Sequence, residues 1–165
     1  MDKFIDYLLN FYYPINNNRP SLEKEGEIMR GMCLGLVGIR PCNRKNGQKH
    51  ALCKMLDKPK YKEMFEKTSE FFYKNINDFK FTSIQYNCNN GCNKHKDSKN
   101  VGLSYIIAFG DYTGGRLIVY DENGDNPEYI DIKEQFYCFN GSKYPHEVEA
   151  FTGQRVSLVF FNVID

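Results

Sequence analysis

From residue 80 onward, apolar and polar positions alternate with the period of two that is typical of half-buried β-strands. Turn-forming stretches such as DENGDNP and NGSKYP separate the apolar runs. Several short strands at this regular spacing predict a barrel or sandwich. The expected strands are residues 79–87, 102–110, 115–121, 128–132, 134–140, 146–151 and 154–163.

Two stretches before residue 80 show helical periodicity instead. Residues 2–12 place apolar side chains three and four positions apart, which predicts a short helix. Residues 59–77 start with Pro59 and set an apolar face against one rich in Lys and Glu, which predicts the clearest helix of the chain. Residues 27–39 are rich in Gly and β-formers and are expected to be extended, and residues 41–50 are expected to be a polar loop.

These elements predict a single domain over residues 1–165, because no linker or internal repeat divides the chain. Residues 1–79 form an N-terminal supporting segment with helices, and residues 80–165 form the β core. The expected fold class is therefore α+β.

The composition is that of a globular protein, with 41% hydrophobic and 15% aromatic residues among 165. A net charge of +1 does not indicate a strongly basic nucleic-acid binder. No apolar run reaches the roughly 18 residues that span a bilayer, and the start lacks the pattern of a signal peptide. We expect an intracellular protein without a membrane partner, whose six cysteines are free thiols.

Candidate chemistry begins at HKD, where His95 and Asp97 stand two positions apart. At a strand end, residues i and i+2 project to the same side. Two histidines and one carboxylate on one face are the ligand set of a non-haem ferrous iron, with three open positions opposite. By itself HKD is weak evidence, because most tripeptides of this kind are solvated surface turns.

His146 is the expected third ligand, because it opens a strand near the C-terminus, about four strands after Asp97. A double-stranded β-helix would return the chain there to the same mouth of the barrel. Alone, His146 would be read as a half-buried histidine at a strand end. His50 lies in a Lys-rich loop and is expected to be solvated.

Arg155 and Ser157 lie on one face of the last apolar strand, QRVSLVFF. A guanidinium can bind a carboxylate through two hydrogen bonds, and a neighbouring hydroxyl adds a third. An arginine within such an apolar strand predicts a buried anion. The alternative is an edge strand with the arginine in solvent.

Taken together, HKD at 95–97, His146, Arg155-Val156-Ser157 and the Gly-Gly turn of GDYTGGRLIVYD resemble the Fe(II)/2-oxoglutarate-dependent dioxygenases. Residues 80–163 look most like the TET/JBP-type branch and its short viral and microbial relatives. The resemblance implies a double-stranded β-helix, also called a jelly-roll or cupin-like core.

The resemblance also implies a role for each residue. His95, Asp97 and His146 would bind Fe(2+), and Arg155 with Ser157 would bind the far carboxylate of 2-oxoglutarate. O2 would be the second cosubstrate, and the product would be a hydroxylated C–H group.

Tyr86 stands where the AlkB-like branch has a tyrosine beside the cosubstrate, although that branch's preceding asparagine is Ile84 here. The chain has no cysteine-rich zinc region like that of TET proteins, which puts duplex-DNA handling of the TET kind in doubt.

Two alternatives remain open near HKD. Cys88, Cys92 and His95 have spacings that allow zinc binding, although a fourth ligand is not evident. Lys94, Lys96 and Lys99 would either attract a phosphate backbone or be ordinary solvated charge.

The expected substrate is the methyl group of a nucleobase in DNA or RNA. A protein side chain hydroxylated in the manner of prolyl or lysyl hydroxylases is the alternative, and a non-catalytic jelly-roll binding module is the third reading. The partners expected are therefore 2-oxoglutarate and either a nucleic acid or a protein substrate.

Overall fold

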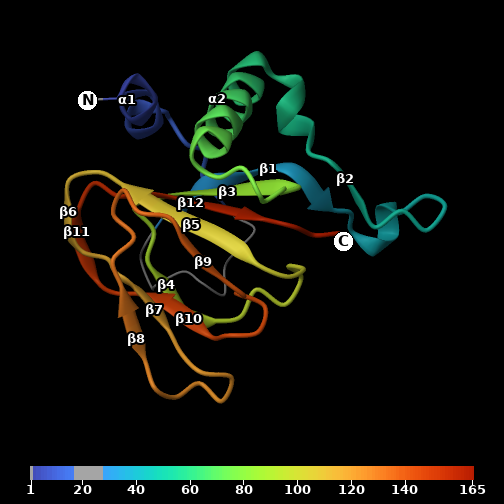
Figure 1. Ribbon diagram of the computed structural model, residues 1–165. Helices are drawn as coiled ribbons and strands as arrows, with labels where there is room; N and C mark the ends of the chain where they lie inside the picture. The colour runs from blue at the N-terminus through green and yellow to red at the C-terminus, as the bar shows by residue number, and fades with distance from the viewer. Residues whose placement is uncertain (1, 17–27) are drawn as a thin grey trace.

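The computed structural model describes residues 2–16 and 28–165, which form two helices, two short 3-10 turns and twelve strands (Figure 1). The helical elements are α1 (Lys3–Asn10), η2 (Pro41–Asn43), η3 (Lys54–Asp57) and α2 (Pro59–Asn75). The first six strands are β1 (Arg30–Gly38), β2 (His50–Leu52), β3 (Ser83–Cys88), β4 (Cys92–His95), β5 (Ser104–Phe109) and β6 (Tyr112–Gly114). The last six are β7 (Leu117–Val119), β8 (Glu128–Ile130), β9 (Tyr137–Phe139), β10 (His146–Val148), β11 (Phe151–Gly153) and β12 (Val156–Phe161).

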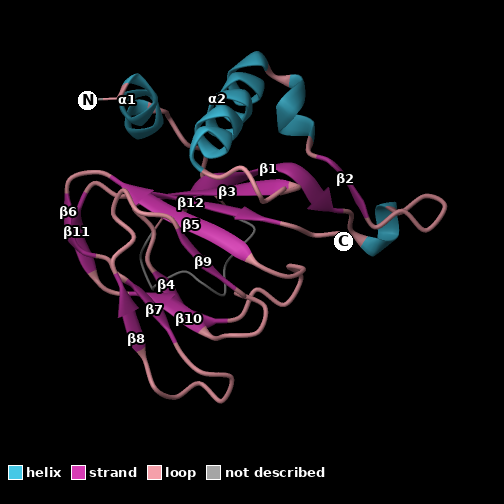
Figure 2. Ribbon diagram, viewed as in Figure 1, coloured by secondary structure: helices cyan, strands magenta, loops and turns pink. Residues whose placement is uncertain are grey.

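The strands form two main antiparallel sheets. The larger sheet has the order β2-β1-β3-β12-β5-β9, and the smaller has the order β4-β10-β7-β8. A separate pair, β11-β6, lies at one end of the two layers. Both helices cover the outer face of the larger sheet, and the smaller sheet faces the other side (Figure 2). This arrangement confirms the expected α+β class with a jelly-roll core and supporting N-terminal helices.

Helix α2 forms because its sequence combines a proline at the first turn with apolar residues on one face. Its buried face carries Tyr61, Met64, Thr68 and Phe72, and this face packs on the larger sheet. The Phe72 ring lies 4.4 Å from that of Phe160 on β12, centroid to centroid. Burial of this face against the sheet, more than intrinsic helix propensity, stabilises the helix.

The two central strands of the larger sheet, β3 and β12, have one apolar and one mixed face. Tyr86 pairs with Leu158 in the register, and both side chains belong to the core under the helices. The alternate positions Asn87 and Ser157 also pair, and they face the smaller sheet. Because strand side chains alternate between faces, the helix-side core leaves the opposite face available for polar groups.

Three short segments differ from the sequence expectations. Residues 92–95 and 112–114 lie outside the expected strands but form β4 and β6. His50 begins β2 and is half-buried, so it does not lie in a solvated loop. Each short strand is specified by its partner, since β4 pairs with β10 and β6 with β11, and such long-range pairing is not visible in local periodicity.

Among the residues that the structure describes, none of the helices has the length and apolar character needed to traverse a bilayer.

We expect Phe72→Ala to lower the free energy of unfolding by about 3–5 kcal/mol, because it removes a fully buried ring from the helix–sheet core. Urea unfolding followed by circular dichroism measures this change. Leu52→Ala is the control, since that side chain is 67% exposed, and its effect should stay within about 0.5 kcal/mol. Equal effects of the two changes would show that the helix is not packed as described.

Candidate metal and anion site

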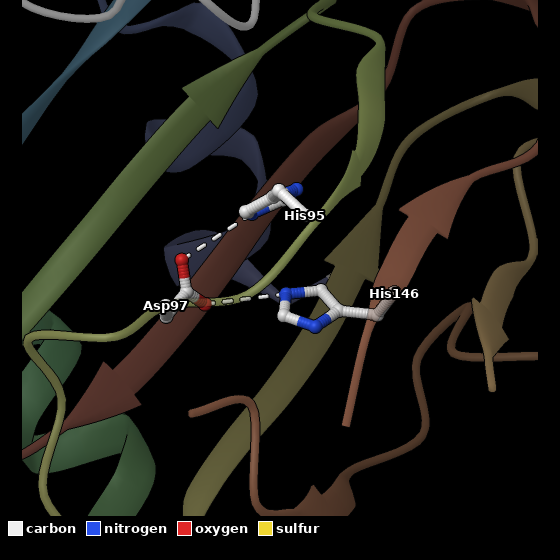
Figure 3. A group of neighbouring side chains, drawn as sticks. All are labelled: His95, Asp97 and His146. Carbon is white, nitrogen blue, oxygen red and sulfur yellow. Dashed lines mark ion pairs between the residues drawn. The ribbon is translucent and has the colours of Figure 1, made fainter. Parts of the chain in front are cut away.

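Three side chains from the smaller sheet and its neighbouring loop converge on one point (Figure 3). His95 at the end of β4 pairs directly with His146 at the start of β10. Asp97 follows two residues after His95, and its backbone N–H donates to the carbonyl of Gly141 at 2.9 Å. One ligand atom from each of the three lies within 4.8 Å of the others.

The carboxylate of Asp97 bridges the two imidazoles. Its Oδ1 lies 3.3 Å from His95 Nε2, and its Oδ2 lies 3.2 Å from His146 Nε2. The Nδ1 atoms face backbone carbonyls instead, at 2.7 Å from Asn93 O and 2.9 Å from Tyr144 O. A carbonyl can only accept, so Nδ1 carries the proton and Nε2 is the atom available to a metal. These carbonyls fix the ring orientation that a metal site requires.

The electrostatics of the three groups are strongly coupled. Burial alone would raise the pKa of the Asp97 carboxyl, but the hydrogen bonds and charges of His146 and His95 outweigh it and hold that pKa well below its usual range. Burial alone would lower the pKa of His95, but its hydrogen bonds with Asp97 and Cys92 raise the pKa to about 10. In the metal-free protein His95 therefore retains a proton that a cation would displace.

Gly141 keeps the space beside this group open. A Cβ at this position would lie 3.2 Å from both Asp97 Oδ2 and His146 Cε1, which is closer than ordinary van der Waals contact. The ring of Phe139 packs edge-on against His146, with centroids 5.0 Å apart. The turn after β9 thus supplies a small residue where the ligands need room and an aromatic wall beside it.

Arg155 is a buried cation, with only 1% of its surface exposed. Its Nε and Nη2 atoms have no hydrogen-bond partner among the residues that the structure describes. The rings of Tyr112 and Phe151 lie 5.5 and 5.4 Å from its guanidinium carbon. Burial lowers the pKa of Arg155 and Tyr112 acts against this, yet a guanidinium stays charged in proteins. Unsatisfied buried donors on a cation create a site for an anion.

Gly115 makes room for this guanidinium. Its φ of +68° lies in the left-handed region that favours glycine. A Cβ there would lie 3.0 Å from Arg155 Nε. The expectation that the Gly-Gly stretch permits a tight turn agrees with this geometry, because Gly114 also has a positive φ of 78°.

One cavity connects the three ligand residues to Arg155. Its volume is about 70 Å³, several times the roughly 10–15 Å³ that a single water needs on the same measure. Ser157 and Asn87 line it, with Asn87 Nδ2 at 3.5 Å from Ser157 Oγ. The cavity therefore joins a metal-ligand group at one end to an anion site at the other, with hydrogen-bonding side chains between them.

Five of the six residues expected from the sequence line this single cavity: His95, Asp97, His146, Arg155 and Ser157.

The expectation for Tyr86 is not met, because its side chain lies on the opposite face of β3, fully buried under the helices. The pleat of β3 directs Gln85 and Asn87 to the cavity, and Tyr86 between them must point the other way. Sequence reasoning did not find Gln85 and Asn87. Their signal is the polar–apolar alternation of SIQYNC, which has apolar side chains at Ile84 and Tyr86.

The zinc alternative is not supported by the described residues. Their only group of three or more potential ligands is His95, Asp97 and His146, which does not include Cys88 or Cys92. Cys92 Sγ lies 3.1 Å from His95 Nδ1 and lines the cavity. None of the six cysteines is in a disulfide in the part of the chain that the structure describes.

The lysines around HKD have different environments. Lys94 places its ammonium 3.7 Å from the centre of the Tyr120 ring and also donates to the carbonyl of Gly124. Lys96 and Lys99 are exposed. Lys94 is therefore partly engaged within the protein, and the other two are surface charges.

Comparison with known proteins gives similarity in structure but not in sequence. No family model and no curated protein matches the chain. An oxidoreductase of the 2OG-Fe(II) oxygenase family from Burkholderia pseudomallei matches with a TM-score of 0.61 and 17% identity, over 95% of this chain and 76% of that one. OsALKBH1 matches with a TM-score of 0.55 and 15% identity, over 97% and 92% of the two chains.

A third solved structure, NgTET1 in complex with 5mC DNA, matches with a TM-score of 0.51 and 16% identity. The match covers 87% of this chain but only 62% of NgTET1. At these identities the likeness shows the fold, which is that of the 2-oxoglutarate/Fe(II) oxygenases. It does not distinguish a TET-type from an AlkB-type branch.

We expect Arg155→Met to stabilise the protein in the absence of ligands by about 1–3 kcal/mol, because it replaces a buried cation with unsatisfied donors by an apolar chain of similar length. Urea unfolding measures the change. Arg116→Met is the matched control, since Arg116 is exposed and makes a bidentate ion pair with Glu149; it should be neutral or slightly destabilising. A large loss of stability in Arg155→Met would mean that the guanidinium already has an internal anion.

We expect divalent-cation affinity to rise with pH, because binding must displace the proton of His95. The pKa of His95 is raised to about 10, so the apparent affinity should increase by up to about tenfold per pH unit as the pH rises toward that value. Calorimetry with Mn²⁺ in buffers of different ionisation enthalpy counts the released protons, with about one expected at pH 7.5. His50→Gln should leave this number unchanged, and a pH-independent affinity would contradict the coupling.

Proposed function

We propose that this protein is an Fe(II)- and 2-oxoglutarate-dependent dioxygenase. The observation that carries the proposal is the joint presence, in one cavity, of a His-Asp-His group and a buried arginine with free donors. Neither feature alone would point to this chemistry. Together they match the two ends of a ligand that chelates a metal with one end and presents a carboxylate at the other.

The ligand chemistry fits ferrous iron. Two imidazoles with free Nε2 atoms and one carboxylate, His95, His146 and Asp97, supply the facial set that leaves further coordination positions open. The backbone carbonyls of Asn93 and Tyr144 hold the two rings in the metal-binding tautomer. We assign these three side chains as metal ligands.

The opposite end of the cavity fits the distal carboxylate of 2-oxoglutarate. Arg155 would donate through its Nε and Nη2 atoms, which lack partners among the described residues. Ser157 would add a hydroxyl, and Asn87 lies beside it. Neutralising the buried cation makes cosubstrate binding favourable and fixes the orientation of the ligand.

When bound, iron and 2-oxoglutarate supply O2 activation coupled to oxidative decarboxylation, which yields succinate and CO2 and oxidises a C–H bond. The residues of this chain position the reactants and exclude water. Ile106 and Leu117 are among the apolar residues that line the cavity. Residues 80–165 carry all the proposed ligands, and their organisation with residues 1–79 as a single domain stays a prediction.

For the substrate we infer a nucleobase methyl group. A second hollow of about 550 Å³ adjoins His146, since its lining includes Phe139, whose ring contacts the histidine, and Val119, which pairs with it. Tyr120, Tyr137 and Tyr144 add further flat aromatic surfaces. Aromatic walls suit stacking on an extruded base.

Polar side chains in the same hollow would read the edge of such a base. They are Asp121, Asn126, Glu128 and Asn140. The solved structure of NgTET1, which contains 5mC DNA, has a similar fold. The TET/JBP-type branch itself rests on motif resemblance alone.

A protein side chain is the second candidate substrate. Strands β8 and β9 are the edges of their sheets and both flank this hollow. A peptide could add to such an edge through backbone hydrogen bonds. An assay of both substrate classes decides between them.

We expect the protein to convert 2-oxoglutarate to succinate in the presence of Fe(2+) and O2, and His95→Ala or Asp97→Ala to abolish this conversion. Mass spectrometry detects succinate, and methylated oligonucleotides and peptide pools are then screened for a gain of one oxygen. Thr113→Ala, at the exposed β6–β11 pair, is the control and should retain activity.

Absence of metal binding and of succinate with every substrate would favour the non-catalytic module. An oxidised peptide with unchanged oligonucleotides would replace the nucleobase assignment.

A further inference from the structure

A dense group of exposed cations lies away from the cavity, between residues 40 and 62. We call this segment the basic arm. Its cations are Arg40, Arg44, Lys45, Lys49, Lys54, Lys58, Lys60 and Lys62, and all are exposed. The single acidic residue within it is Asp57. None of these cations takes part in an ion pair with any other residue that the structure describes.

The net charge of the chain is near zero, but its positive and negative residues are unevenly distributed. The whole sequence has 22 basic and 21 acidic residues, so the part outside the basic arm has 14 basic against 20 acidic ones. The arm is therefore strongly positive and the remainder negative. Such a separation orients an approaching polyanion toward the arm.

The first part of the basic arm, residues 40–50, projects from the edge of the larger sheet as the teal loop between β1 and β2 in Figure 1, and the rest runs through β2 and η3 into the start of α2. Asn46 and Gly47 have positive φ angles of 51° and 72° and turn the chain at its tip. Arg44 Nε donates to the carbonyl of Ile39, and Gln48 Nε2 donates to that of His50. These bonds shape the loop and leave the lysine ammonium groups in solvent.

The arm leaves the sheet at the same end as the loops that carry the metal ligands. The register pairs Gly35 with Ser83 and Ser83 with Phe161. It continues by pairing Phe160 with Tyr105, and Ser104 with Phe139. The end of β1, the start of β5 and the end of β9 therefore lie at one end of the barrel.

The loops at this end hold the site together. The 97–103 loop enters β5 and the 140–145 loop leaves β9, and the Asp97 N–H donates to Gly141 O between them. Val101 N also donates to Asn162 O, just past the end of β12. The end of β1, where the chain leaves the sheet into the basic arm, and the loops beside the metal ligands thus lie at the same end of the barrel. The later part of the arm, η3 and the start of α2, lies on the helix-covered face of the larger sheet.

The separation suits a nucleic-acid backbone. Strands β3 and β12 lie between β1 and β5, so the end of β1 lies three strand spacings, or roughly 14 Å, from the start of β5, which the 97–103 loop enters. Duplex DNA carries one charge per roughly 1.7 Å of axis, or about eight charges over that distance. A strand with one base in the site would therefore bring several phosphates within reach of the arm.

The composition of the arm favours phosphates over lipid. Residues 40–50 contain no large apolar side chain that could enter a bilayer. Asn43, Asn46 and Gln48 stand among the cations, and amides beside Arg and Lys are frequent phosphate contacts. These residues position a backbone without reading its sequence.

We propose that the basic arm binds the sugar–phosphate backbone of a nucleic acid and directs one of its bases to the metal site. This inference rests on the proposed function for the base, whereas the backbone contact can be measured without any oxidation. The arm would attract the phosphate backbone by its charge, and the metal site would select the base that reacts.

The test compares two triple variants with equal loss of charge. The arm variant is Lys45→Gln, Lys49→Gln and Lys54→Gln, and the control is Lys3→Gln, Lys67→Gln and Lys74→Gln on the two helices. Fluorescence anisotropy with labelled single-stranded and duplex DNA gives the affinity between about 50 and 200 mM salt. Equal unfolding midpoints and equal succinate formation without prime substrate show that both variants are folded and loaded.

We expect the arm variant to bind DNA about 10- to 100-fold more weakly at about 100 mM salt. The plot of log affinity against log salt should become less steep, with the magnitude of its slope smaller by about two to three. The control should change affinity less than about threefold. Equal weakening in both variants, or no DNA binding by the unaltered protein, would overturn the proposal. So would arm-dependent binding of polyglutamate or anionic vesicles that matches or exceeds DNA binding.

The readouts separate this inference from the proposed function. Arm-dependent DNA binding without oxidation of any oligonucleotide would support the arm as a DNA-binding surface and contradict the nucleobase as substrate. If the arm variant and the control oxidise an oligonucleotide at equal rates and bind it with equal affinity, the nucleobase substrate is supported and the arm is not the DNA-binding surface.

Discussion

The pairing of β10 with β4 is the constraint from which the site follows. It sets His146 opposite His95, and opposite residues in an antiparallel pair have their Cβ atoms about 4.5–5.5 Å apart. Asp97 then needs only two further residues of chain to reach both imidazoles. A register shift of one residue would turn His146 to the outer face and remove it from the group. Strand register thus places the two histidines, and the loop that follows β4 places Asp97.

The larger sheet provides the anion-binding part of the cavity. Its outer face buries the aromatic core around Phe72 and Phe160 under α2. Its inner face then carries Arg155, Ser157 and Asn87, at a cost in desolvation that this apolar burial offsets. A buried guanidinium with unused donors is unfavourable in the empty protein and favourable with an anion. The same residue therefore limits ligand-free stability and creates affinity.

The sequence was sufficient for the short-range part of this arrangement. His95 and Asp97 are fixed by a spacing of two, and Arg155 and Ser157 share a face for the same reason. His146 could be joined to them only through resemblance, because five strands, β5 to β9, intervene and their register depends on tertiary pairing. The placement of Tyr86 could not be predicted, because the packing of α2 determines which face of β3 is covered, and Tyr86 lies on that face.

The small size of the cavity explains why a large substrate would bind to one part of the molecule and react at another. A cavity of about 70 Å³ between the metal ligands and the arginine admits a small dicarboxylate but not a macromolecule. Any large substrate must remain outside and present one group to the site; the hollow lined by Tyr120 and Tyr137 adjoins His146 through Phe139 and Val119. Under our proposal, its affinity would come from the basic arm at that end of the barrel. Such a division lets the cavity mouth select the reacting group while distant cations supply most of the binding free energy.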